Sequence, residues 1–191
     1  MKKNLFVQSL KTVFILVAIC LVCGALLALA NDLFFVDDAT KFAQTAQSIY
    51  PGFEVDQTLE VDSSFKLNYG TVNSVTKSKD GGYILDVTGT GGYNNGTVTL
   101  YVGVNAKGHI TGWSIKDNVG QSFISKITSN HQKTWYIPVN DSVEHTVADT
   151  YDMEYSTAAG ATFTSTAINH AINVAAKYCH DILGLGAKGV E

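Results

Sequence analysis

A long uncharged apolar run near the N-terminus constrains this chain more than any other feature. Residues 12–30, TVFILVAICLVCGALLALA, hold no charged side chain over 19 positions. A helix of about 20 apolar residues is long enough to cross the hydrocarbon core of a bilayer. We therefore expect residues 12–30 to form a single transmembrane anchor in contact with membrane lipid.

The charges around this run predict its orientation. Basic residues precede it at Lys2, Lys3 and Lys11, whereas the first charged residues after it are acidic. Positive charge on a short flank favours the cytoplasmic side of the membrane. Residues 1–11 should thus be cytoplasmic, and residues 31–191 should form an extracytoplasmic domain at the cell membrane.

A cleaved signal peptide is the alternative interpretation. The tripeptide Ala-Leu-Ala at residues 28–30 resembles an A-x-A cleavage site, and the preceding lysines resemble a positive n-region. The apolar run is longer than the roughly 7–15 residues of a usual signal-peptide core, which favours a retained anchor. Cleavage after Ala30 stays open as the second possibility.

The part of the chain after the run is one acidic domain. All 17 acidic residues lie there, against 10 of the 13 lysines, which gives it a formal charge of −7. This charge argues against a nucleic-acid partner and against adsorption on anionic lipid. The chain contains no arginine, so a bound phosphate must be held by backbone amides, hydroxyls, a lysine or a covalent bond.

The pattern of this domain predicts an α+β fold, with an antiparallel sheet and flanking helices. Asp38 can cap a helix from Ala39 to about Tyr50, which Pro51 and Gly52 end. Four segments rich in β-branched and aromatic residues follow, and glycine-containing turns separate them, so consecutive strands should pair antiparallel. These segments are residues 72–77, 83–88, 97–104 and 109–115.

The C-terminal part of the chain predicts a long helix. Apolar residues recur at spacings of three and four from Ala167 to Ile182, and Gly184 should end the helix. Residues 117–154, between the last strand and this helix, show no clear periodicity and predict no definite element.

Three hydroxyl side chains, those of Thr162, Thr164 and Ser165, crowd the start of this helix in the sequence AGATFTS. One of the threonines could simply cap the helix. Gly160 and Ala161, however, leave the approach sterically open, and the first helical amides carry unmet donors and a partial positive charge. Together these features predict a phosphate-sized anion site.

The sequence AGATFTS is similar to the S/T-G-A-T-x-T-S motif of FMN-binding domains in the G subunit of the Rnf complex and in the C subunit of the sodium-translocating NADH:quinone oxidoreductase. In that family a flavin transferase joins FMN through its phosphate to the threonine of G-A-T. The resemblance implies covalent FMN on Thr162, with Gly160, Ala161, Thr164 and Ser165 around the phosphate.

The resemblance extends to most of the chain, including residues 91–113, GGYNNGTVTLYVGVNAKGHITGW. In this segment Tyr93 and Trp113 are candidates to lie against the flavin ring, with ordinary sheet packing as the alternative for both. The family's flavin-contacting E-T-P-G-L-G loop is replaced here by a loop without the acid. The residues that stand in for it are Gly120, Gln121 and Ser122.

The resemblance implies a membrane-anchored flavoprotein subunit that relays electrons in a Rnf-type ion-translocating complex, beside other membrane subunits. It would be an electron-transfer subunit of a translocase rather than a self-sufficient enzyme. The sequence shows no arrangement of nucleophile, base and orienting group, and no histidine spacing typical of a metal site. Two alternatives stay open: a stand-alone extracytoplasmic FMN carrier, and a non-enzymatic surface β module with a membrane anchor.

The anchor interpretation predicts that the mature chain keeps Met1 or Lys2 and stays in membranes after a high-salt wash. Salt screens charges but does not weaken the burial of an apolar span in lipid. N-terminal sequencing and membrane fractionation measure the two properties. A mature N-terminus at Asn31 would show that the signal-peptide interpretation is the right one.

Overall fold

The N-terminal unit, residues 1–41, consists mainly of one long helix, α1 (Lys2–Phe34). Within it, Leu10–Asn31 is long and apolar enough to cross a membrane, with a mean hydropathy of 3.1 over an 18-residue window. A signal sequence at the same place would meet the same criterion, so the structure agrees with both interpretations of this segment. The computed structural model describes residues 2–34, 37–136, 147 and 157–186.

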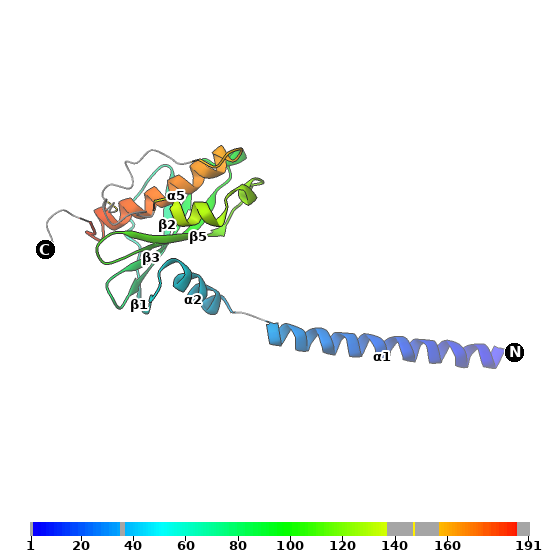
Figure 1. Ribbon diagram of the computed structural model, residues 1–191. Coiled ribbons are helices and arrows are strands. Elements are labelled where there is room, and N and C mark those ends of the chain that lie inside the picture. The colour runs from blue at the N-terminus through cyan, green and yellow to red at the C-terminus, as the bar shows by residue number, and fades with distance from the viewer. Residues whose placement is uncertain (1, 35–36, 137–146, 148–156, 187–191) are drawn as a thin grey trace. The chain divides into compact units, whose positions relative to one another are not determined.

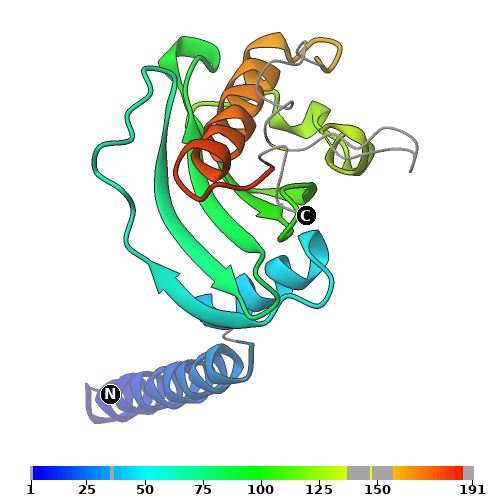
Figure 2. The same cartoon turned by 90° about the vertical axis from the view of Figure 1, so that its left-hand side faces the viewer.

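The second unit, residues 42–191, contains a five-stranded antiparallel sheet with helices on both faces (Figure 1, Figure 2). The strands lie in chain order, and each pairs antiparallel with the next. Helix α5 covers one face, and α2 packs on the other from Phe42 onward. The elements are α2 (Asp38–Ile49), β1 (Val55–Leu59), β2 (Gly70–Ser78), β3 (Tyr83–Gly89), η1 (Tyr93–Asn95), β4 (Val98–Val104), β5 (Ile110–Asp117), η2 (Ile124–Lys126), α3 (Ser129–Thr134) and α5 (Thr162–Asp181).

Strand β3 shows how the two faces of the sheet share the apolar residues. Leu85 and Val87 are fully buried in the larger cluster, on the side of α5. Ile84 lies instead in the smaller cluster with Ile49 and Phe53, on the side of α2. Because successive side chains of a strand point to opposite faces, a strand covered on both faces carries apolar residues on both. The one buried charge of β3, Asp86, is paired with Lys116.

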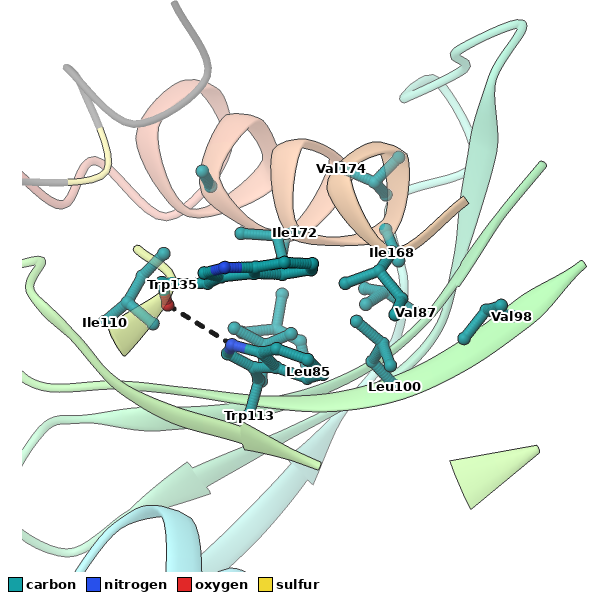
Figure 3. Close-up of a cluster of buried hydrophobic side chains, with 14 of the residues drawn as sticks. Leu85, Val87, Val98, Leu100, Ile110, Trp113, Trp135, Ile168, Ile172 and Val174 are labelled. Atoms are coloured by element: carbon teal, nitrogen blue, oxygen red, sulfur yellow. Dashed lines mark hydrogen bonds between the residues drawn. The ribbon is translucent and has the colours of Figure 1, made fainter. Parts of the chain in front are cut away.

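Two tryptophans connect the sheet to the segment after α3 (Figure 3). The indole N–H of Trp113 donates to the backbone carbonyl of Trp135 at 3.2 Å, and the two rings stack with centroids 6.1 Å apart. Trp113 is 2 % exposed. It is therefore a core residue with a satisfied donor, which agrees with the sheet-packing alternative for Trp113 rather than with a position against a ligand ring.

Helix α5 lies close to the sheet because small residues meet at the crossing. Ala167 and Ala171 on the helix face Gly89 at the end of β3. A β-carbon on Gly89 would collide with the Ala167 carbonyl oxygen and would lie 2.5 Å from the Ala171 amide nitrogen. Backbone thus packs against backbone at this point, and the contact fixes the position of the helix.

The sequence predicted the fold class and most elements correctly. The α+β architecture, the helix after Asp38, the four strands and the C-terminal helix are all confirmed, with strand ends displaced by up to two residues. Gly184 has a φ of +69° just beyond the C-cap, Ile182, as expected for a residue that ends a helix. Strand β1 was missed because four of its five residues are exposed, so it carries no apolar pattern.

The segment without a predicted element, residues 117–154, contains η2 and α3. Both are short, and α3 has only six residues, which explains why no helical periodicity is visible in the sequence. The remaining residues of this segment from 137 on, apart from Val147, lie outside the described part of the chain.

The close crossing predicts that Gly89→Ala destabilises the domain. The added methyl group must push α5 away from β3, which should lower the free energy of unfolding by about 1–3 kcal/mol or more. Urea denaturation followed by tryptophan fluorescence measures the change. Val55→Ala, on the exposed edge strand, is the control and should stay within about 0.5 kcal/mol. Equal stability of Gly89→Ala and the wild type would contradict the packing of α5 on β3.

Candidate functional site

Helix α5 begins without a side-chain cap. Its N-cap residue is Ala161, no side chain makes a cap hydrogen bond, and neither threonine caps the helix. The amide of Ser165 makes the first helical hydrogen bond, to the Ala161 carbonyl at 2.8 Å. The amides of Thr162, Phe163 and Thr164 have no acceptor inside the helix, so the positive end of the helix is open to a ligand.

Gly160 directs the chain into this helix. Its φ is +75°, in the left-handed region that glycine adopts without strain, and a β-carbon there would meet no atom within 4 Å. Free space at Gly160 lies next to Thr162, which is the first residue of α5 and is exposed. The predicted open approach to the N-terminus is confirmed at Gly160, whereas Ala161 is buried.

A cavity of about 300 Å³ lies at this N-terminus, at the lower end of the size range of ligand pockets. Three aromatic side chains line it and are at least half exposed: Tyr93 (52 %), Phe123 (50 %) and Phe163 (61 %). The Tyr93 and Phe163 rings meet edge to face with centroids 6.2 Å apart. The other lining residues are Gly160, Ala161, Thr162 and Thr164.

Three separate segments bring these aromatic side chains together. Tyr93 comes from η1 in the β3–β4 connection, Phe123 from the segment just before η2, and Phe163 from α5. Asn94 and Asn95 of η1 both adopt positive φ, 52° and 59°, a conformation that asparagine tolerates better than most residues. Exposed aromatic residues gathered around a cavity indicate a surface for binding a ligand or a partner.

The three hydroxyls at the start of α5 have different environments. Thr162 is exposed at the cavity, whereas Thr164 is 2 % exposed and donates to Gln121 Oε1 at 3.0 Å. Ser165 is fully buried, and its Oγ accepts the amide of Ala158 at 3.0 Å. Thr164 already donates its one hydroxyl proton to Gln121, and Ser165 is fully buried, so the prediction that these two hydroxyls solvate a phosphate does not fit the structure.

The loop expected to contact the ring has a different role. Gly120 and Ser122 are exposed, Gln121 is 5 % exposed, and none of the three lines the cavity. Gln121 points inward because its amide is bonded to protein groups. The cavity residue of this loop is Phe123, which sequence reasoning missed; the sequence around it, QSFISK, carries no motif or period that marks it.

Every residue that lines the cavity is uncharged. Within the described ranges, no group of three or more His, Cys, Asp or Glu residues lies close enough to hold a metal ion. The site can therefore offer an anion only helix amides and hydroxyls, and it can offer a planar ring only apolar and aromatic walls.

Comparison with known families bears directly on this site. Residues 92–177 match the model of the FMN-binding domain family. The matched segment contains every residue that lines the cavity. A search of curated proteins finds no match to the chain. The match supports an FMN-binding domain in this part of the chain.

The residues present fit FMN in three respects. Thr162 offers an exposed hydroxyl at the rim of the helix N-terminus, where a phosphate is favoured. Tyr93, Phe123 and Phe163 offer aromatic walls on which an isoalloxazine ring could pack. Gly160 leaves room beside the hydroxyl.

The placement of Ser165 predicts a structural role for its hydroxyl. Ser165→Ala leaves the buried amide of Ala158 without an acceptor, which should lower the free energy of unfolding by about 1–3 kcal/mol. Urea denaturation measures this loss. Thr166→Ala is the matched control in the same helix, since its hydroxyl only donates to the Thr162 carbonyl one turn earlier. It should change stability by no more than about 0.5 kcal/mol, and an equally small effect of Ser165→Ala would contradict the assigned bond.

Proposed function

We propose that this chain is a membrane-anchored flavoprotein that carries FMN covalently, through its phosphate, on Thr162, and that relays electrons. The observation that carries the proposal is the exposed Thr162 hydroxyl at an uncapped helix N-terminus, beside an aromatic cavity, within the segment that matches the FMN-binding domain model. An N-terminal helix of suitable length and composition supports the membrane anchor.

The proposed attachment uses Thr162 as an oxygen nucleophile. Its Oγ1 forms the bond to phosphorus and loses its proton, and a flavin transferase supplies the flavin as an activated phosphoric anhydride. The other half of that anhydride is the leaving group. The product is a phosphodiester with one negative charge, which the open amides of Phe163 and Thr164 can stabilise without an arginine.

The remaining residues hold and orient the cofactor. Bound FMN supplies the redox chemistry, whereas the protein supplies binding and orientation. Tyr93, Phe123 and Phe163 provide the walls against which a ring can pack, and their exposed faces keep the cavity open to solvent on one side. A ring held in this way stays accessible to an electron donor or acceptor at the protein surface.

Membership in a Rnf-type complex is the finer form of the proposal, and it rests on the resemblance of AGATFTS to that family. The chain then acts as the G-like subunit, beside other membrane subunits, with its main domain extracytoplasmic. A stand-alone extracytoplasmic carrier would use the same residues. Co-purification from mildly solubilised membranes separates the two, because a subunit of the complex brings partners with flavin or iron–sulfur centres and a stand-alone carrier does not.

A surface module without a cofactor is a poorer match to these observations. Such a module would be colourless and would have no need for an exposed threonine at an uncapped helix N-terminus. It also leaves unexplained why three aromatic side chains stay exposed around a cavity, where burial would have stabilised the domain.

The proposal predicts that Thr162→Val abolishes covalent FMN while the domain stays folded. Valine has the same shape but no oxygen nucleophile, and the hydroxyl of Thr162 makes no cap bond whose loss would destabilise the helix. Thr162→Ser should retain some flavin because it keeps the oxygen. Intact-mass spectrometry after co-expression with a flavin transferase measures the added mass, and circular dichroism verifies folding. Flavin still attached in Thr162→Val, or no FMN mass on the wild type, would refute the proposal.

A further inference from the structure

The side-chain amide of Gln121 joins the segments that form the cavity. Its Oε1 accepts two hydrogen bonds, from the backbone amide of Tyr93 at 3.2 Å and from the hydroxyl of Thr164 at 3.0 Å. Its Nε2 donates to the carbonyl of Val119 at 3.2 Å, and that carbonyl also accepts the amide of Thr97. One buried side chain thus connects the β3–β4 connection, the segment after β5 and the start of α5.

The chemistry of the partners fixes the orientation of this amide. The backbone N–H of Tyr93 can only donate and the carbonyl of Val119 can only accept, so the oxygen of Gln121 must face Tyr93 and its nitrogen must face Val119. Thr164 is therefore the donor in its bond to Gln121. A flipped amide would place a donor against a donor and an acceptor against an acceptor, so no rearrangement in place satisfies the same groups.

Two glycines of the β3–β4 connection make room for this side chain. A β-carbon on Gly92 would lie 2.7 Å from the side-chain carbonyl carbon of Gln121, and one on Gly96 would collide with Gln121 Nε2. Neither glycine has a positive φ, so backbone conformation alone does not require glycine at these positions. The packing of Gln121, together with the nearby carbonyl oxygens of Gly96 and Val119, explains why positions 92 and 96 are glycine.

We propose that Gln121 is a positioning residue that sets the aromatic walls of the cavity and, resting on the proposed function, the environment of the bound flavin ring. It does not line the cavity and acts through Tyr93, Thr164 and the loop that carries Phe123. The role of Thr164 follows from the same geometry: its hydroxyl connects α5 to Gln121 and does not solvate the phosphate. Attachment of flavin to Thr162 is chemically independent of this network.

The first test measures how firmly the hydrogen bonds of Gln121 hold the surrounding segments, and it does not require bound flavin. Gln121→Met and Thr164→Val each remove hydrogen bonds at nearly constant side-chain size. Hydrogen exchange of residues 91–97 and 118–123, followed by mass spectrometry of the full chain in detergent, should accelerate about three- to tenfold in both variants. Thr164→Ser, which keeps the donor, should exchange like the wild type.

Thr99→Val is the matched control for these variants. It removes a hydroxyl that pairs with Thr88 at 2.9 Å elsewhere in the sheet, and it should leave exchange in both segments unchanged. Unchanged exchange in both Gln121→Met and Thr164→Val would overturn the proposal. Acceleration in Thr99→Val of equal size would overturn it as well, because the effect would then be general loosening of the domain.

The second test measures how exposed the bound flavin ring is to solvent. In Gln121→Met and Thr164→Val the flavin mass should remain attached, whereas iodide should quench flavin fluorescence more strongly than in the wild type. Faster exchange with unchanged quenching would show that the network does not position the flavin walls, and would overturn the proposal. Absence of FMN from the wild type would instead refute the proposed function, and the exchange measurements would still decide whether Gln121 holds the three segments together.

Discussion

The close crossing of α5 over the end of β3 is the contact on which the site depends. Ala167 and Ala171 can approach Gly89 only because neither side carries a large side chain at the crossing. A helix is a rigid rod with a rise of about 1.5 Å per residue, so fixing it at Ala167 also fixes Thr162, roughly 7.5 Å nearer its N-terminus. The position of the open amides therefore follows from packing in the core rather than from the loop that precedes the helix.

Helix periodicity and burial then separate residues that look equivalent in the sequence. Successive residues of a helix point about 100° apart, so Thr164 points roughly 200° away from Thr162. Ser165, one turn further on, lies on nearly the same face as Thr162, but it is fully buried and accepts the amide of Ala158. The three hydroxyls predicted to form one anion site therefore have two roles: that of Thr162 is exposed, and those of Thr164 and Ser165 make hydrogen bonds inside the domain.

The difference between buried and exposed side chains explains which parts of the fold could be predicted from the sequence. Segments rich in β-branched and aromatic residues, separated by glycine-containing turns, revealed the covered strands, and apolar residues at spacings of three and four revealed the buried face of α5. Strand β1 and the wall residue Phe123 left no such pattern, since an exposed edge strand and a loop obey no period. Two side-chain orientations depend on partners distant in sequence. Trp113 faces the core because it bonds the carbonyl of Trp135, and Gln121 faces inward because it accepts from Thr164.

Retention of a cofactor at this site needs more than the cavity supplies. Its volume is about 300 Å³, its walls are partly open to solvent, and no charged side chain lines it. Apolar contact over so small an area, opposed by the entropy lost on binding, gives weak noncovalent affinity. The proposed bond from Thr162 to the phosphate would make retention of the cofactor independent of that affinity. The aromatic walls could then stay open to solvent, and the tethered ring would remain accessible to an electron donor or acceptor.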